Sequence, residues 1–332
     1  TFIDPYREFL LEFNLESIKP IALYIKKSED DNDEESHQYY LIMECFKNLS
    51  EFFITFKRRY KDDKKKKQLY FDKYLSILLI TVSLLQTIAI LHVQKIPVLH
   101  HDLKPGNVLL SEKKIENGEL KNVDIIPGNL DHKLGHFYFA QLIDFGLTKE
   151  SDSKTLKTGT YLYRPMALYL KETDLFAVAI ILKLTLIGFH KSLTDYMNME
   201  YITCKNPNYV YKKYKDHYIR RFYFRDPSNL KGLDIIVNML LNSYYNRRTI
   251  IFDILDILTD KEKLAKIISG DLEGKNIEID QKELLDKYLE ILKLSNIDIK
   301  YLPDFEKIAP KIYGKNFKAF LFTMFHQKNN DF

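Results

Sequence analysis

Two short segments of this sequence carry the side chains that could do chemistry. Residues 98–110 and 142–146 place Asp102, Asn107 and Asp144 on turns between apolar runs. Phosphoryl transfer needs a carboxylate to orient the acceptor hydroxyl, an amide and a second carboxylate to hold Mg²⁺, and a lysine near the γ-phosphate. With Lys104, the two segments supply this set, and their side-chain oxygens are the ligands that Mg²⁺ prefers. The layout is typical of a phosphoryl-transfer site.

Short strands are predicted to hold the two segments. A strand over 108–110 follows Asn107, and a strand over 137–143 runs into Asp144. Together they would form a small ribbon under a nucleotide, with amide and acidic side chains at its end. A polar, glycine-containing insertion over 111–135 lies between them in the chain, and we expect it behind the active site.

The longest apolar run, residues 75–93, raises the question of a membrane span. Ser76, Thr81 and Gln86 interrupt it, and the turn that carries Asp102 follows closely. We therefore predict a helix over 71–93 that is buried on all sides within a domain, and no transmembrane segment.

The other elements follow from periodicity and from cap signals. Strands are predicted over 18–25 and 38–43, on either side of an acidic loop at 29–35. The basic run 64–67 is predicted to be a solvated loop between helices, with binding of phosphate or anionic lipid as the alternative. Further helices are predicted over 5–15, 49–60, 174–187, 261–268, 281–294, 305–313 and 316–325, with apolar helical clusters at 233–241 and 250–258.

Composition limits the class of protein and its partners. The 332 residues are 45% hydrophobic, enough for one large or two modest domains with a core. A net charge of +4 with 29% charged residues is a mixed surface that requires no nucleic acid partner. Cys45 and Cys204 have no metal-ligand spacing and cannot form a disulfide framework, which favours a reducing, intracellular compartment such as the cytoplasm.

In its motifs the sequence resembles the eukaryotic-type protein kinase family. Residues 100–107 are similar to the catalytic loop of that family, and residues 144–146 are similar to its metal-binding motif. The resemblance implies that Asp102 orients the substrate hydroxyl, that Lys104 neutralises the γ-phosphate, and that Asn107 and Asp144 hold Mg²⁺ or Mn²⁺. It also implies ATP as the cofactor, bound by residues of the hinge and the ribbon: Met43, Glu44, Phe46, Leu109, Phe145 and Gly146.

The resemblance covers residues 5–258 and keeps the order of the family's motifs. Residues 159–165 are similar to the substrate-docking segment, which places Thr160 and Tyr163 beside the substrate, and 174–176 are similar to the start of the central helix. The implied fold is α+β, protein-kinase-like and bilobal. Its expected parts are a partial N-lobe with a truncated sheet over 1–45, a mostly helical C-lobe over 46–259 and a helical C-terminal extension over 260–332.

Several positions depart from the family pattern. The sequence has no glycine-rich loop and no Val-Ala-Ile-Lys strand, so we expect the lysine that grips the α- and β-phosphates upstream of Thr1. The alternative is a protein that works without it. Glu8 is assigned as the partner of that lysine, with an ordinary surface glutamate as the alternative. His101 replaces the arginine that reads a phosphorylated activation loop, so we expect no activation by loop phosphorylation. Met166 replaces a glutamate of the docking segment, so we expect altered substrate docking.

Three functions remain open from the sequence. The first is a serine/threonine protein kinase that transfers the γ-phosphate of ATP to protein hydroxyls, since Lys104 with Thr160 is the serine/threonine pattern. The second is a pseudokinase scaffold that binds a partner protein through its helical tail, suggested by the missing N-lobe motifs. The third is a small-molecule kinase of the aminoglycoside or choline type, which Lys104 and residues 159–160 disfavour. The divergent activation segment and tail also suggest a kinase delivered into a host cell as an effector.

Overall fold

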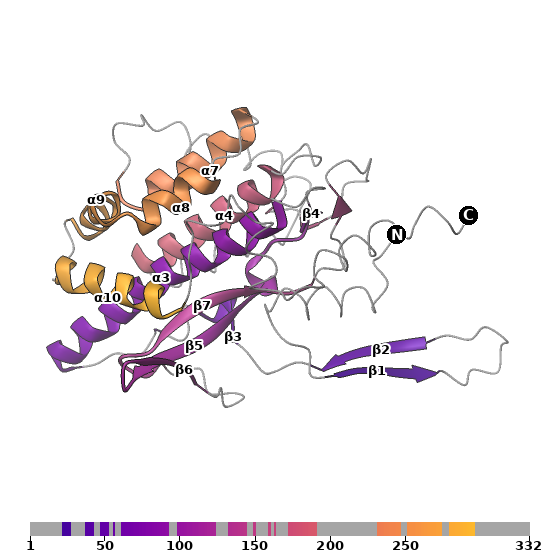
Figure 1. Cartoon of the computed structure of the whole chain (residues 1–332), viewed down its shortest axis with the longest axis horizontal. Helices are drawn as coiled ribbons and strands as arrows, with labels where there is room; N and C mark the ends of the chain where they lie inside the picture. The colour runs from indigo at the N-terminus through magenta and orange to yellow at the C-terminus, as the bar shows by residue number, and fades with distance from the viewer. Residues whose placement is uncertain are drawn as a thin grey trace.

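The computed structural model describes residues 22–27, 37–42, 47–52, 56, 61–92, 98–123, 132–144, 149–150, 159–160, 163, 172–190, 231–246, 251–273 and 279–295. These residues form small antiparallel sheets and long helices (Figure 1), so the predicted α+β class is confirmed. The helices predicted over 5–15, 305–313 and 316–325 and the acidic loop at 29–35 lie outside the described residues.

The first sheet has two strands, which confirm the predicted pair. β1 (Ala22–Lys27) and β2 (His37–Ile42) are antiparallel, with a register that runs from Ala22 opposite Ile42 to Lys27 opposite His37. In Figure 1 this hairpin projects from the rest of the described chain.

The second sheet is organised around β5 (Val108–Glu116), which pairs with β3 (Lys47–Asn48), β6 (Glu119–Asn122) and β7 (Phe137–Leu142). The strand predicted over 108–110 was therefore too short, and the polar insertion predicted over 111–135 begins with a regular hairpin. β5 continues for nine residues and turns back into β6 through Asn117 and Gly118, both at positive φ (56° and 77°). An Asn-Gly pair with these angles is the preferred two-residue hairpin turn.

The central helix is α3 (Asp63–His92), which confirms a buried helix over 75–92. Its first turn contradicts the loop predicted at 64–67. The backbone N–H of Lys65 donates to Asp62 Oδ1 (3.1 Å), and this cap lets a run of helix-forming lysines start the helix. By length and composition α3 could cross a membrane, but 89% of its most apolar window is buried inside the protein, as expected of a core helix.

Away from β7, α3 packs against α4 (Glu172–His190), α8 (Ile251–Thr259) and α10 (Gln281–Leu294) (Figure 1). α7 (Asp234–Asn246) packs mainly on α4, and α9 (Lys261–Leu272) packs on α8 and α10. The predicted bounds of α10 are confirmed, and α9 continues beyond the predicted 261–268. Asp260 and Asp280 cap α9 and α10, each accepting two backbone N–H groups. Of the helix predicted over 49–60, the structure describes a 3-10 turn, η1 (Leu49–Glu51), which Asn48 caps, and the buried Phe52 and Phe56.

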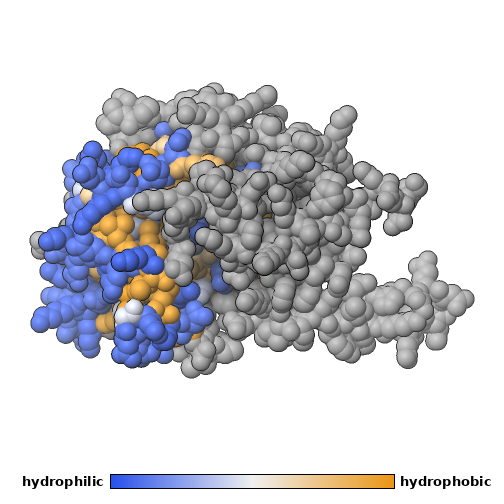
Figure 2. Space-filling view, in the orientation of Figure 1, coloured by the Kyte–Doolittle hydropathy of each residue, from blue (hydrophilic) through white to orange (hydrophobic). Residues whose placement is uncertain are grey.

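α9 and α10, the first two helices of the predicted C-terminal extension, contribute side chains to the hydrophobic core that contains α3. The buried Asp271 of α9 accepts the Tyr74 hydroxyl of α3 (2.6 Å) and the backbone N–H of Leu233 (2.9 Å). Tyr288 of α10 is fully buried in the same core. In Figure 2 the coloured surface is mostly polar, with an apolar band in the region where α10 lies in Figure 1. The predicted domain limits stay predictions.

Candidate active site

The two chemical segments meet at one end of the β5–β7 ribbon. The 100–107 loop runs from β4 (Val98–Leu99) through η2 (Pro105–Asn107) into β5. Val108 lies opposite Leu142, and the Ile143 N–H donates to the Asn107 carbonyl (3.1 Å). This pairing brings Asn107 and Asp144 together, as the sequence predicted. β4 also pairs with β8 (Lys149–Glu150), which ties the chain after Asp144 to the start of the loop.

The Asp102 carboxylate accepts hydrogen bonds on both oxygens. Lys104 Nζ lies 2.5 Å from Oδ2, and Asn107 Nδ2 lies 3.3 Å from the same oxygen. The N–H and the hydroxyl of Thr160 both donate to Oδ1, at 2.8 and 2.7 Å. The Asp102 side chain is 7% exposed, whereas the Lys104 side chain is 31% exposed. The lysine is therefore the donor best placed to leave the carboxylate and reach a ligand in the solvent.

Asn107 links the Asp102 loop to Asp144. Its amide Nδ2 donates to the Asp102 carbonyl (2.9 Å) and to Asp144 Oδ2 (3.0 Å), and Asn107 itself is buried. Asp144 has a positive φ of 63°, a strained angle for a residue with a side chain. Amide and carboxylate oxygens suit Mg²⁺, which commonly takes its remaining ligands from phosphate and water. The described residues contain no cluster of three His, Cys, Asp or Glu that would hold a metal alone.

Thr160 reaches Asp102 because Gly159 packs directly against the loop. Gly159 has a φ of +88°, and a Cβ at this position would lie 2.2 Å from the His101 carbonyl oxygen. Only glycine combines that angle with that approach.

Gly159→Ala is expected to lower both kcat and the melting temperature, because the added methyl pushes Thr160 away from Asp102. The strain should amount to about 1–3 kcal/mol of unfolding free energy. Gly135→Ala is the matched control, since Gly135 has a similar φ of +84° but open space around its Cβ position. Equal losses in the two variants, measured by steady-state kinetics and thermal denaturation, would show that the close approach to His101 has no role.

Asp174, a buried aspartate of α4, binds the backbone of the 100–107 loop. Asp174 Oδ2 accepts the backbone N–H of His100 (2.9 Å) and lies 3.1 Å from His92 Nε2, while Oδ1 accepts the N–H of His101 (3.1 Å). Burial, the largest influence, raises the pKa of Asp174, but the His92 hydrogen bond and the three nearby imidazoles lower it by more, so the pKa lies below 3.8. The charged carboxylate thus holds the loop backbone, including His101 at its positive φ of 68°.

His100 connects this loop to the segment that ends in Asp144. Its Nε2 lies 3.0 Å from the Ile143 carbonyl, which makes it the N–H donor, and Nδ1 faces the Asp102 N–H at 3.4 Å. The ring therefore joins the two segments, with Nε2 as the donor and Nδ1 as the acceptor.

The structure brings five of the sequence-predicted residues together: Asp102, Lys104, Asn107, Asp144 and Thr160. Tyr163 is buried nearby, with its N–H on the Thr160 carbonyl (3.1 Å). Leu109 is partly exposed between the buried Val108 and Leu110, so it lies on the opposite face of β5 from the core. The remaining predicted residues lie outside the described part of the chain: Glu8, Met43, Glu44, Phe46, Phe145 and Gly146.

Sequence reasoning missed two features of the site. Asp174 was assigned only to the start of a helix, and the anchoring role of His92 was not foreseen. A carboxylate that opens a strongly apolar helix was a signal, because such a charge must find buried partners. Gly159 was placed in a motif without its reason, the contact with the His101 carbonyl.

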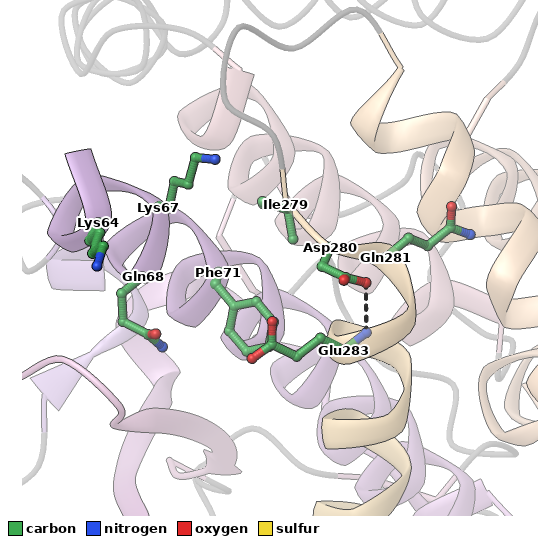
Figure 3. Close-up of a pocket in the computed structure, with 8 residues that line it drawn as sticks. All are labelled: Lys64, Lys67, Gln68, Phe71, Ile279, Asp280, Gln281 and Glu283. Carbon is green, nitrogen blue, oxygen red and sulfur yellow. Dashed lines mark hydrogen bonds between the residues drawn. The ribbon is translucent and has the colours of Figure 1, made fainter.

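A separate cleft of about 570 Å³ lies between the starts of α3 and α10 (Figure 3). Its walls differ in charge: α3 contributes Lys64 and Lys67, and the α10 end contributes Asp280 and Glu283, with Phe71 between them. The residues that line the cleft do not include Asp102, Lys104, Asn107, Asp144 or Thr160, so the cleft is not part of the candidate active site.

Comparison with known proteins assigns the chain by family. The family model described as "Protein kinase domain" matches residues 23–258, more than two thirds of the chain. The matched range contains Asp102, Lys104, Asn107, Asp144 and Thr160, and it ends in the last turn of α8. No curated protein matches the chain significantly.

Proposed function

The chain belongs to the protein kinase domain family, and from this premise we propose that it is an active serine/threonine kinase that phosphorylates protein hydroxyls with ATP. Membership also fits the α+β fold, with its small antiparallel sheets and predominantly helical remainder. Kinase domains generally use ATP with Mg²⁺ and act on proteins. Activity and preference for serine or threonine are the parts of the proposal that go beyond the family.

One observation carries the proposal: Asp102, Lys104, Asn107 and Asp144 form one connected hydrogen-bonded group. Lys104 and Asn107 both donate to Asp102, and Asn107 joins it to Asp144 on the neighbouring segment. Catalysis of phosphoryl transfer consists mainly of such positioning and charge stabilisation. The group has the composition and the arrangement that this chemistry needs.

The contacts also suggest how the residues would share the work. An acceptor hydroxyl needs an oxygen of Asp102, and movement of the partly exposed Lys104 toward the γ-phosphate would free the nearer of the two donor positions on Oδ2, where Asn107 is the other donor. Asn107 and Asp144 would hold Mg²⁺, which neutralises phosphate charge when bound. Thr160 would keep Asp102 oriented through Oδ1 while Lys104 is away.

Preference for serine and threonine is supported by the same group. Lys104 stands two residues after Asp102, and the Thr160 hydroxyl binds the Asp102 carboxylate, which is the combination expected of a serine/threonine kinase. The buried ring of His101, 8% exposed, supports a site that works without a phosphate-reading arginine. An intracellular location and delivery as an effector stay predictions, as does a docking partner on the C-terminal helices.

Asp144→Asn is expected to abolish transfer of ³²P from ATP to a generic protein substrate, because the neutral amide is a much weaker Mg²⁺ ligand than a carboxylate. Asp253→Asn on the exposed side of α8 is the matched control and should label as the unmodified protein does. Labelling by Asp144→Asn at the control's rate would contradict the metal assignment.

The scaffold alternative predicts a different result. Ligand binding raises apparent stability by mass action, so ATP with Mg²⁺ should raise the melting temperature of the unmodified protein. A protein that shows neither that rise nor any labelling would favour a pseudokinase scaffold over the proposed enzyme.

A further inference from the structure

Lys47 is a buried lysine on the two-residue strand β3. Its side chain is 4% exposed, and its Nζ lies 3.2 Å from Glu112 Oε2 on β5, whose side chain is 5% exposed. The ammonium also stands 5.6 Å from the centre of the Tyr138 ring on β7. One cation on β3 therefore contacts both strands of the ribbon that leads to Asn107 and Asp144.

Glu112 is held on both of its oxygens. His136 Nδ1 lies 2.7 Å from Oε1, while Lys47 occupies Oε2. Burial, the largest influence, raises the pKa of Glu112, but the hydrogen bonds and charges of His136 and Lys47 lower it by more, and the pKa ends below 4.5. The glutamate is thus ionised at neutral pH and forms a true ion pair with Lys47.

The strand pairing explains why these side chains meet. Lys47 lies opposite Leu110 and Asn48 lies opposite Leu109. Side chains alternate along a strand, so Lys47, Leu110 and Glu112 share the face of the sheet that packs on α3. Leu109, the residue that the resemblance places under the nucleotide base, points to the other face. The ion pair therefore lies on the face of the sheet opposite to Leu109, the residue that is proposed to contact the nucleotide base.

Stability alone does not account for this pair. Replacing a buried ion pair by apolar side chains of similar size is often neutral or stabilising, so a buried lysine and glutamate need another reason. β3 has only two residues and pairs with β5 through them, so the backbone pairing alone does little to fix the register of the two strands. A specific buried pair fixes it, because only one register of β3 brings Lys47 to Glu112.

We propose that Lys47 and Glu112 are positioning residues for nucleotide binding, which hold β3 in register on β5, the strand that follows Asn107 and carries Leu109. This rests on the proposed function, since Leu109 would bind the base only in a kinase. The pair contacts no substrate in this role and acts through the backbone of β3.

The test separates positioning from stability with three variants of the full chain. Lys47→Met and Glu112→Met each strand one buried charge and should lower the melting temperature. The double variant removes both charges and should recover part of that loss, although His136 Nδ1 then lacks its Glu112 partner. Its Kd for adenosine, measured by isothermal titration calorimetry, and its KM for ATP should nevertheless stay about tenfold above those of the unmodified protein, while kcat at saturating ATP changes by less than about twofold.

A matched control lies on the same hairpin. Lys114 and Glu116 form an ion pair of 3.0 Å with side chains 37% and 52% exposed, and replacing both by Met should leave the adenosine Kd unchanged. A double variant at 47 and 112 that binds adenosine as the unmodified protein does would overturn the inference. An unmodified protein that binds no adenosine would overturn it as well. If the unmodified protein binds adenosine but transfers no phosphate, the proposed function fails alone, because the comparison of adenosine Kd values still stands.

Discussion

Asp102→Asn is expected to reduce kcat by about a thousandfold with little change in the KM for ATP, because an amide cannot take the proton of the acceptor hydroxyl. Asp102 accepts Lys104 and Asn107 on one oxygen and both Thr160 donors on the other. The substituted amide keeps one acceptor oxygen, so part of this arrangement should survive. The measurement is steady-state phosphorylation of a protein substrate with ATP varied at fixed Mg²⁺.

Asp256→Asn provides the control for this substitution. Asp256 is exposed on α8 and pairs with Lys263 at the surface (2.5 Å), far from the ribbon in the chain. Surface pairs contribute little, so its kinetics should match those of the unmodified protein. If Asp102→Asn keeps a kcat within tenfold of the control while its melting temperature is unchanged, Asp102 is not the residue that handles the hydroxyl proton.

Asp174→Asn is expected to cost about 3–5 kcal/mol of unfolding free energy, the range for removing one charge of a buried network. The carboxylate, 2% exposed, accepts three N–H groups that come from His92, His100 and His101. An amide turns one acceptor into a donor and leaves at least one buried N–H facing an N–H. Urea denaturation measures the loss, and kcat should fall with it because His101 and Asp102 are neighbours in the loop.

The same aspartate gives the stability of the protein a predictable pH dependence. The folded pKa of Asp174 lies below its ordinary value of 3.8, so its contribution is complete above that pH and is lost as the pH falls through the folded value. Asp174→Asn should therefore unfold at neutral pH with less urea and lose less stability between pH 5 and pH 3. Asp234→Asn is the control. Asp234, on α7, is a partly exposed ion-pair partner of Lys183, which lies on α4 as Asp174 does. A steeper acid loss in Asp174→Asn than in Asp234→Asn would contradict the anchoring role.

The sequence by itself was enough to predict the four central residues of the candidate active site and the protein family. Asp102, Lys104 and Asn107 stand within six residues, and Asp144 follows a short apolar strand, so local turns were enough to predict that the four lie together. The long helix now seen as α3 was equally readable, since a run of apolar residues this long has to be buried somewhere. These features depend on neighbours in the chain, which a sequence records directly.

Local signals failed where a favourable cap or turn was hidden in a polar stretch. The run at 64–67 was predicted as a loop, but Asp62 caps it and lysine is a good helix former. The strand after Asn107 was predicted to end at residue 110, but it continues through polar residues to Glu116, and Asn117 and Gly118 turn it into a hairpin with β6. In both cases the polarity of the side chains masked a backbone preference.

Only the tertiary structure shows which residues hold the candidate active-site residues in place. His100 and Asp174 are 74 residues apart, and Lys47 and Glu112 are 65 apart, yet each pair is buried in direct contact. No periodicity specifies which buried charge meets which, because partner choice depends on how α4 and β3 pack against the ribbon. The candidate active-site residues were predictable from local turns, whereas their anchors come from packing between elements that are distant in the chain.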